Sequence, residues 1–369
     1  MRVKLEDVCE RGSSNIKQSD IIKMSGNYPI YGASGLAGKV NFYHQEQPYV
    51  AVVKDGAGIG RTTLNPAKSS VIGTMQYLIP KKNVLPEYLF YVVSYMHLEK
   101  YYTGATIPHI YFKDYKNEEF NLDNIEKQLE IIDVLGRCKK VIEARKQELV
   151  ELDRLTKARF VEMFGDPIQN PKGWDMPLIE EVVANEKNAL KAGPFGSALK
   201  KGYYVASGYK IYGQEQVISD DCTFGDYYID EERYKSLENC AVQPGDVLIS
   251  LVGTYGKLLI MPEVFEPGII NPRLMKITFD KEKVNPYYFK FFFQSESLKK
   301  ALSQNTHGGT MDILNLGIVR KIEMPLPPLK LQNEFVDFVH QVDKSKVAVQ
   351  KALDETQILF DSLMQKYFG

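Results

Sequence analysis

The sequence predicts an α+β protein in which two mixed, strand-rich domains are each followed by one long helix. Three observations lead to this fold class: an internal repeat, an apolar period of three and four residues in two segments, and a glycine-containing pair of strands in each half. The chain has 369 residues, 44% of them apolar, and this length suits two domains better than one core. We expect the first domain at residues 1–122, its helix at 123–165, the second domain at 166–325 and its helix at 326–369.

The two helices are predicted from the repeat. Residues 127–165 align with residues 331–369 without a gap at a constant offset of 204, and ten of the 39 positions are identical, including Gln128 and Gln332. Apolar residues recur at intervals of three and four, as in a coiled-coil seam, although Arg145 and Lys346 interrupt it. About 36 residues at 1.5 Å each would form a rod of about 54 Å. The expected seam consists of Ile131, Leu135, Ile142, Leu149, Leu152, Phe335, Val339, Val342, Leu353 and Phe360.

Each half also carries a glycine-containing turn between two apolar strands. The segment DGAGIG at 55–60 is similar to a loop that binds a dinucleotide or S-adenosylmethionine, but such a loop needs a helix directly behind its glycines. Both copies continue instead as a strand that ends at proline, and Gly58 has no counterpart in the second copy. We therefore expect a hairpin in each half, followed by the basic residue Arg61 or Lys257. The expected turn glycines are Gly56 and Gly60 in the first half and Gly253 and Gly256 in the second.

Composition excludes several classes of protein. The four cysteines lie far apart, which argues against a zinc site and a disulfide scaffold and suits a reducing compartment. No stretch of about 20 apolar residues is present, and the N-terminus has no apolar signal core, so we expect a cytoplasmic protein. The histidines show no metal-ligand spacing and no Ser/His/Asp set stands out, so we expect a chain that is not itself an enzyme. The net charge of −1 means that any nucleic-acid binding must depend on local positive charge.

Several segments together resemble the specificity subunit of type I restriction–modification systems. These segments are GDVLISLVGTYGKLLI at 245–260, GIINPRLMKI at 268–277 and MPLPPLKLQ at 324–332, which leads into the second long helix. The first half carries LDNI at 122–125 where the second carries LPPL, and DGAGIGR in its turn. The resemblance extends over essentially the whole chain.

The resemblance implies two target-recognition domains and two spacer helices that pack antiparallel with pseudo-twofold symmetry. Each domain would read one half of a bipartite, gapped and asymmetric target in double-stranded DNA. The helices would set the gap and dock two methyltransferase subunits, which methylate adenine, and nuclease/translocase subunits are a further expected partner. No cofactor is expected in this chain, and S-adenosylmethionine, ATP and Mg would bind only to the partner subunits.

Candidate DNA-binding residues follow from that resemblance and from local positive charge in loops that recur in both halves. Lysines suit phosphate contacts, which position a protein, whereas forked side chains suit base edges. We expect Lys39, Lys68, Lys191 and Lys210 to add positive charge near these loops. The candidates are Ser34, Lys54, Arg61, His109 and Lys113 in the first domain and Lys200, Lys201, Gln214, Glu215, Lys257, Arg273 and His307 in the second.

Three alternatives remain open at this point. The first is a duplicated coiled-coil adaptor without DNA readout, the second is an enzyme built on DGAGIG, and the third is the specificity subunit of a solitary methyltransferase complex. Binding of S-adenosylmethionine to the isolated chain would support the second alternative.

Overall fold

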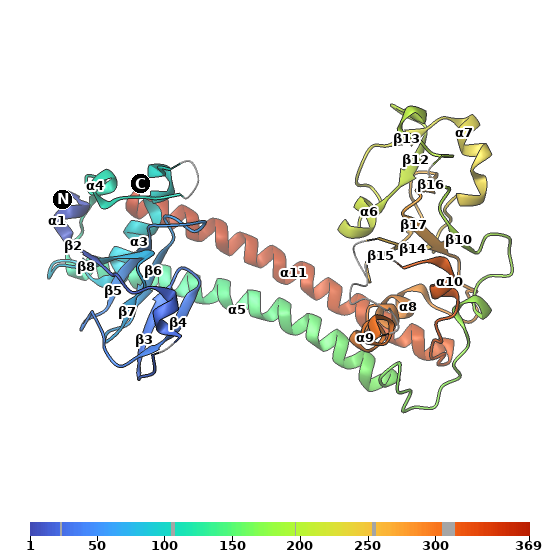
Figure 1. Cartoon of the computed structure of the whole chain (residues 1–369), viewed down its shortest axis with the longest axis horizontal. Helices are drawn as coiled ribbons and strands as arrows, with labels where there is room; N and C mark the ends of the chain where they lie inside the picture. The colour runs from blue at the N-terminus through green and yellow to red at the C-terminus, as the bar shows by residue number, and fades with distance from the viewer. Residues whose placement is uncertain (23, 105–107, 196, 253–255, 305–313) are drawn as a thin grey trace. The chain divides into compact units, whose positions relative to one another are not determined.

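The structure is a computed structural model that describes residues 1–22, 24–104, 108–195, 197–252, 256–304 and 314–369. The chain divides into two compact units, which we call unit 1 (Met1–Glu148 and Ala348–Gly369) and unit 2 (Leu149–Val347). Both ends of the chain lie in unit 1 (Figure 1). Each unit combines strands with short helices and contains a part of both long helices, α5 (Ile125–Phe164) and α11 (Leu329–Phe368). The expected α+β fold class is confirmed.

Unit 1 contains a four-stranded antiparallel sheet of order β2-β8-β5-β6, a three-stranded sheet of order β4-β3-β7 and the pair β1-β9. Strand β5 lies inside the first sheet, and all five of its residues, YVAVV, are buried, as expected for a strand covered on both faces. The strands are β1 (Arg2–Lys4), β2 (Cys9–Ser13), β3 (Tyr28–Gly32), β4 (Gly35–Val40), β5 (Tyr49–Val53), β6 (Thr62–Asn65), β7 (Ser70–Val71), β8 (Met75–Pro80) and β9 (Glu119–Asn121).

Helix α3 covers this sheet in unit 1. It begins with a proline at its first turn, where the missing N–H costs nothing, and its apolar side chains form one core with β5, β8 and the ends of the long helices. The helices are α1 (Leu5–Val8), α2 (Gln18–Ile21), α3 (Pro86–Tyr95), the 3-10 helix η1 (Leu98–Tyr101) and α4 (Phe112–Tyr115).

Unit 2 repeats this plan with a four-stranded antiparallel sheet of order β10-β17-β14-β15 and a second sheet of order β11-β13-β12-β16. The parallel pair β12–β16 corresponds to the parallel pair β3–β7 of unit 1. The strands are β10 (Leu190–Ala192), β11 (Tyr204–Val205), β12 (Tyr209–Tyr212), β13 (Tyr228–Ile229), β14 (Val247–Ser250), β15 (Leu258–Ile260), β16 (Gly268–Ile270) and β17 (Leu274–Ile277).

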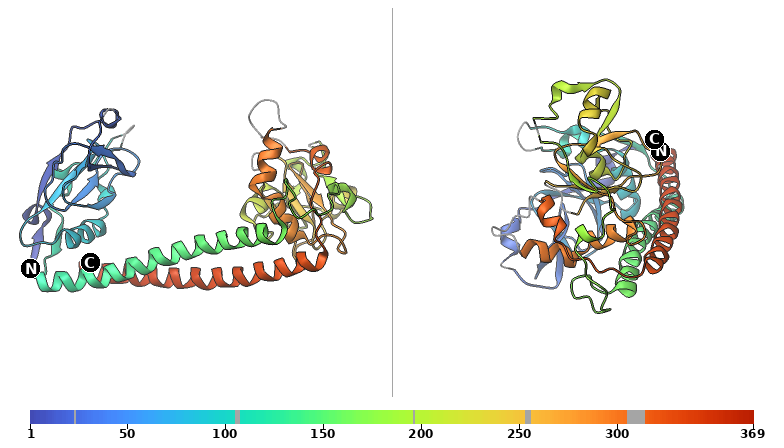
Figure 2. Two further views of the ribbon diagram at one scale, coloured as in Figure 1. Left: turned by 90° about the horizontal axis from the view of Figure 1, so that it is seen from below. Right: turned by 90° about the vertical axis from the view of Figure 1, so that its right-hand side faces the viewer.

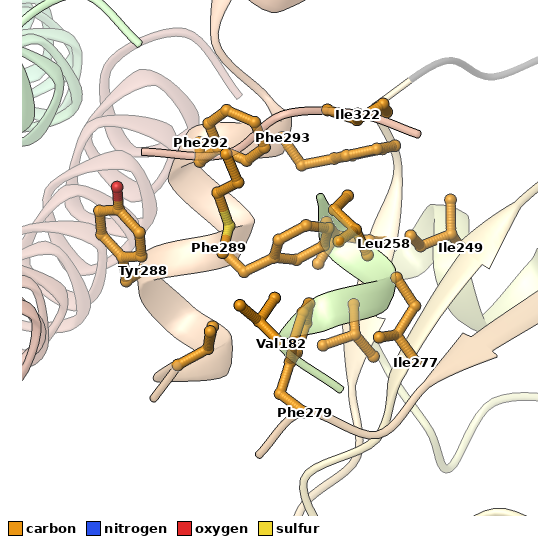
Figure 3. Close-up of a cluster of buried hydrophobic side chains, with 14 of the residues drawn as sticks. Val182, Ile249, Leu258, Ile277, Phe279, Tyr288, Phe289, Phe292, Phe293 and Ile322 are labelled. Atoms are coloured by element: carbon orange, nitrogen blue, oxygen red, sulfur yellow. The ribbon is translucent and has the colours of Figure 1, made fainter. Parts of the chain in front are cut away.

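The main core of unit 2 is aromatic. Helix α8, of sequence PYYFKFFF, begins at the N-cap Asn285, whose side chain accepts a hydrogen bond from the Tyr287 amide. Its phenylalanines Phe289, Phe292 and Phe293 gather against aliphatic side chains of the sheet (Figure 3). The helices are η2 (Ile179–Glu181), η3 (Lys201–Tyr203), α6 (Gln214–Ser219), α7 (Glu231–Ser236), η4 (Glu238–Cys240), α8 (Pro286–Phe293), α9 (Glu296–Gln304) and α10 (Leu316–Arg320).

The long helices are antiparallel, because each unit pairs the start of one helix with the end of the other (Figure 2). In unit 1, Ile131 of α5 shares a core with Phe368 of α11. In unit 2, the ring of Phe164 lies 5.5 Å from that of Phe335. Each helix has 40 residues and lies inside its expected segment, 123–165 or 326–369, and all ten expected seam residues are buried or half-buried. No helix in the described part of the chain is long and apolar enough to cross a membrane.

The repeat is also visible in the backbone hydrogen bonds of the two units. The amide of Ile110 donates to the carbonyl of Lys54 in unit 1, and the amide of Leu314 donates to that of Leu251 in unit 2. Positions 110 and 314 differ by the same offset of 204 that relates the helices. The repeated plan therefore extends from the helices into the loops beside the glycine turns.

Candidate nucleic-acid interface

In unit 1 the glycine-containing segment is the turn of a hairpin between β5 and β6. The amide of Val53 donates to the carbonyl of Arg61, and the amide of Gly60 donates back to Val53, both at 2.9 Å. Gly60 has a φ of 80°, and a Cβ at this position would lie 2.6 Å from the backbone nitrogen of Glu99. Since the chain continues as β6 and not as a helix, the turn lacks the helix N-terminus that a dinucleotide loop uses.

Arg61 connects this turn to the neighbouring β3–β4 turn. Its Nη1 donates to the carbonyl of Ala33 at 3.1 Å, next to the exposed Ser34. Ser34 and Asp55 both line a cavity of about 600 Å³, whose wall also includes residues 15–18 and 72–74. The structure thus brings Arg61 and Ser34 together, and the guanidinium of Arg61 retains donors for a ligand because only one donor is used in this contact.

Asp55 contacts two further candidates of unit 1, His109 and Lys54. Its carboxylate lies 2.6 Å from Nδ1 of His109 and 3.7 Å from Nζ of Lys54. Because a carboxylate only accepts, Nδ1 of His109 carries the proton, and Nε2 is left for a ligand. The His109 ring stacks on Tyr111 at 6.3 Å, and Nζ of Lys113 lies 5.5 Å from the centre of the same tyrosine ring. Lys54, His109 and Lys113 therefore gather around Asp55 and Tyr111, while Arg61 and Ser34 meet at the β3–β4 turn.

In unit 2 the second hairpin joins β14 to β15 as expected, and the amide of Ser250 donates to the carbonyl of Lys257 at 3.4 Å. Gly256 has a φ of 78°, close to that of Gly60. Lys257 follows it and is exposed. Gly253 lies outside the described residues.

Gln214 and Arg273 meet beside this hairpin. Nη1 of Arg273 donates to Oε1 of Gln214 at 3.2 Å, and Nε2 of Gln214 donates to Oγ of Ser250 at 2.8 Å and to the carbonyl of Val252 at 2.6 Å. Both side chains line a cavity of about 610 Å³ whose wall also includes Glu215.

Of the remaining candidates of unit 2, one lysine lines this cavity. Lys201 lines the same cavity as Gln214, and Lys200 precedes it in the chain; both lysines are exposed. His307 lies outside the described residues, so the structure does not place it.

The expectation that Lys210 adds positive charge near the loops is wrong. This side chain is only 1% exposed, and its Nζ donates to Oε1 of Glu266 at 2.7 Å and to the carbonyl of Thr223 at 2.9 Å. The hydrogen bond from Lys210 lowers the pKa of Glu266 below its ordinary value. Lys210 is therefore a structural residue, because strand β12 turns its side chain inward.

Sequence reasoning missed Asp55, Ser250 and Asn271. Asp55 binds His109 from 54 residues away, Ser250 holds Gln214, and Oδ1 of Asn271 accepts from the amide of Arg273 at 2.9 Å. Each stands within or directly beside a motif that was singled out, DGAGIG, GDVLIS or INPR. Their position in those motifs was the available signal, but short polar residues in turns usually serve the backbone alone.

Comparisons with known proteins agree with this architecture. A family model described as "Type I restriction modification DNA specificity domain" matches residues 1–154 and 171–356. The Type I restriction enzyme MjaVIII specificity subunit of Methanocaldococcus jannaschii is 22% identical over 371 residues, covering 89% of this chain and 84% of that protein.

Two solved structures share the fold. The S subunit of a type I restriction–modification system from M. genitalium has a TM-score of 0.58 at 14% identity, covering 100% of this chain and 96% of that one. A chain from a study of complex assembly and conformational transition in the type I R-M system has a TM-score of 0.63 at 16% identity, covering 100% and 97%.

Proposed function

The chain belongs to the type I restriction modification DNA specificity family, and from this premise we propose that unit 1 and unit 2 each read one half of a bipartite DNA target. One observation carries the proposal: the same turn-and-strand frame recurs in both units, but it presents different side chains. Unit 1 offers Arg61 and the His109–Asp55 pair, whereas unit 2 offers Arg273, which contacts Gln214. Because different side chains match different base edges, the two half-sites differ in sequence and the target is asymmetric.

The long helices set the gap between the half-sites. A helix of 40 residues is about 60 Å long at 1.5 Å per residue, which exceeds one turn of B-DNA at about 34 Å. A spacer of that length would leave base pairs between the two half-sites unread. Insertion of whole turns of helix in α5 and α11 together is therefore expected to lengthen the gap without changing either half-site.

Two methyltransferase subunits dock on the helices and methylate adenine with S-adenosylmethionine. The support in this chain is apolar surface outside the seam: Val141, Val150 and Val161 on α5 are 42%, 58% and 55% exposed. Exposed apolar side chains on a helix favour a protein partner, whereas the seam residues are used within each unit. ATP and Mg belong to nuclease/translocase subunits, and this chain contributes recognition and no chemistry.

The test is co-expression of the chain with the methyltransferase encoded beside it, followed by mapping of methylated adenine in genomic DNA. A gapped motif with two different half-sites is expected. Domain exchange between this chain and a relative of known target should then change one half-site at a time. A complex that forms and methylates without a gapped motif contradicts the two-half-site proposal.

The alternatives give different results in the same assay. An adaptor without DNA readout predicts that Arg61→Ala and Arg273→Ala leave DNA binding by the assembled complex unchanged. A cofactor-binding enzyme predicts that S-adenosylmethionine binds the isolated chain in a calorimetric titration, where we expect no binding. A solitary methyltransferase complex gives the same motif but no restriction of unmodified DNA.

A further inference from the structure

The side chain of Gln214 has no N–H left for a base. Both hydrogens of its Nε2 are directed to acceptors, one to Oγ of Ser250 at 2.8 Å and one to the carbonyl of Val252 at 2.6 Å. Its Oε1 already accepts from Arg273. A glutamine that reads adenine must offer one donor and one acceptor to the base edge at the same time. Gln214 therefore holds other groups of unit 2 in place and does not read a base itself.

Arg273, in contrast to Gln214, has several side-chain N–H donors that no contact in the described chain uses. Its backbone is fixed at both ends, since its amide donates to Oδ1 of Asn271 at 2.9 Å and its carbonyl accepts from Leu251 at 2.9 Å. Its exposed guanidinium has five N–H donors, and the contact with Gln214 uses one of them. Within the described residues no carboxylate forms an ion pair with it. The guanidinium is thus held by a neutral group and keeps its charge and most of its donors for a ligand.

The cavity beside Arg273 carries the groups that a G·C pair needs. It has about 610 Å³ of space, and its wall includes the exposed side chains of Glu215 and Lys201. The lysine suits a phosphate, whereas the carboxylate repels a phosphate and accepts well from the N4 amino group of cytosine. Guanine presents two acceptors, O6 and N7, in the geometry of the arginine fork. Arginine and glutamate on one wall therefore match a G·C pair.

Unit 1 lacks this pair of residues at the corresponding place. The amide of Lys54 donates to the carbonyl of Thr74, as that of Leu251 donates to Arg273, so Thr74 stands where unit 2 has Arg273. The segment YPIYGASG at 28–35 corresponds to YKIYGQEQ at 209–216, so Ala33 stands where unit 2 has Gln214. A readout built on Arg273 and Gln214 is confined to unit 2 and to its half-site.

We propose that Arg273 reads a guanine in the half-site of unit 2 through O6 and N7, and that Gln214 is a positioning residue that fixes the plane of its guanidinium. This inference rests on the proposed function. It adds the identity of one base and separates the roles of two residues in one cavity.

The experiment uses the complex with its methyltransferase and measures single-turnover methylation of duplexes that carry the mapped motif. Each guanine of each half-site is replaced in turn by 7-deazaguanine, which lacks the N7 acceptor. For the wild-type complex we expect one such replacement, in one half-site only, to slow methylation by about 5- to 150-fold. This arm needs no variant and is independent of any folding defect.

The variants assign that effect to the two residues. With Arg273→Ala or Arg273→Lys, the sensitive guanine should become replaceable by other bases while the remaining motif is kept, because lysine keeps the charge but not the fork. Gln214→Ala should relax the same position, and the double variant should add little to either single one. Lys299→Ala, which removes an exposed charge on α9, is the matched control and should leave the motif unchanged.

Three results overturn the inference. The first is that no guanine in either half-site responds to 7-deazaguanine. The second is that Arg273→Ala weakens methylation of all sequences equally and lowers the salt dependence, as expected for a phosphate contact. The third is that Gln214→Ala reduces activity without relaxing any position. In each of these cases the wild-type complex still shows a gapped motif, so the proposed function stands; absence of that motif in the wild type overturns both.

Discussion

Gln128 and Gln332 make the same three hydrogen bonds in the two units. Oε1 of Gln128 accepts from the amide of Leu85 at 2.9 Å, and its Nε2 donates to the carbonyls of Asn83 and Asp123. Gln332 repeats this pattern with the amide of Asn285 and the carbonyls of Lys283 and Pro327. Both side chains are fully buried. Each glutamine therefore fastens the first turn of a long helix to the loop that precedes α3 or α8.

Replacement of either glutamine by alanine should destabilise one unit only. Gln128→Ala leaves one amide and two carbonyls without partners inside unit 1, and Gln332→Ala does the same in unit 2; the expected cost is about 3 kcal/mol or more in each case. Urea unfolding followed by hydrogen exchange measures the loss and locates it. Gln357→Ala, at an exposed site on α11, is the control and should cost less than about 0.5 kcal/mol. Equal losses in both units would contradict the assignment.

The last aromatic residue of each long helix completes a core. Phe368 lies against Tyr88 of unit 1 with ring centres 5.4 Å apart, and Phe164 lies against Tyr288 of unit 2 at 4.8 Å. Phe368→Ala should cost about 3–5 kcal/mol of the stability of unit 1, and Phe164→Ala a similar amount in unit 2. Phe195→Ala, at a side chain that is 89% exposed, is the matched control. Hydrogen exchange of β5 reports on unit 1, and that of β14 reports on unit 2. Faster exchange in β14 instead of β5 for Phe368→Ala would refute the prediction.

Equivalent positions in the central sheets of the two units carry an aromatic pair in unit 1 and an ion pair in unit 2. In unit 1, Tyr49 and Tyr77 pack with ring centres 5.0 Å apart. In unit 2, Asp246 directly before β14 and Lys276 of β17 are both buried, with Oδ2 of Asp246 3.0 Å from Nζ of Lys276. The aspartate also accepts from the hydroxyl of Thr278.

Removal of one member of this ion pair should be much worse than removal of both. Asp246→Ala leaves the Lys276 ammonium buried without its partner, at an expected cost of about 3–5 kcal/mol. Asp246→Leu combined with Lys276→Met removes both charges and should recover most of that stability. Thermal unfolding of the two variants measures the difference. A double variant no more stable than Asp246→Ala contradicts the explanation by unpaired charge.

The stability of unit 2 should fall at acid pH through Glu266. Because the hydrogen bond from Lys210 lowers the pKa of Glu266 in the folded chain, its contribution is complete above the unfolded value of about 4.3 and is lost as the pH falls through the lowered folded pKa. Since the glutamate side chain is half exposed, the pH-dependent part is about 0.5–1 kcal/mol. Glu266→Gln should be less stable than wild type at pH 7 and equal to it near pH 2–3. Glu263→Gln is the exposed control, and a difference that persists at low pH contradicts the linkage.

The sequence predicted the elements whose signal is local or repeated. The helices followed from the 204-residue offset and from their apolar period, and the hairpins followed from glycines such as Gly60 placed between two apolar strands. These features depend on short-range geometry, which the residue types specify directly.

The pairings inside the candidate interface could not be predicted. His109 meets Asp55 through an isolated bridge between two loops, and Arg273 meets Gln214 because β12 and β16, distant in sequence, are neighbours in a sheet. Nothing in the local sequence fixes those contacts. The same limit led to the error at Lys210, since a lysine in a strand turns inward or outward according to a register that the sequence alone did not reveal.

The division of the chain has a consequence for its synthesis. Unit 2 is one uninterrupted segment, whereas unit 1 needs Ala348–Gly369 to finish the core that Met1–Glu148 begins. At about 5–20 residues per second, a ribosome takes about 10–40 s to make the roughly 200 residues between these two parts. During that interval the apolar faces that Met364 and Phe368 will cover are open to water or to a chaperone. The half that is translated first is the half that is completed last.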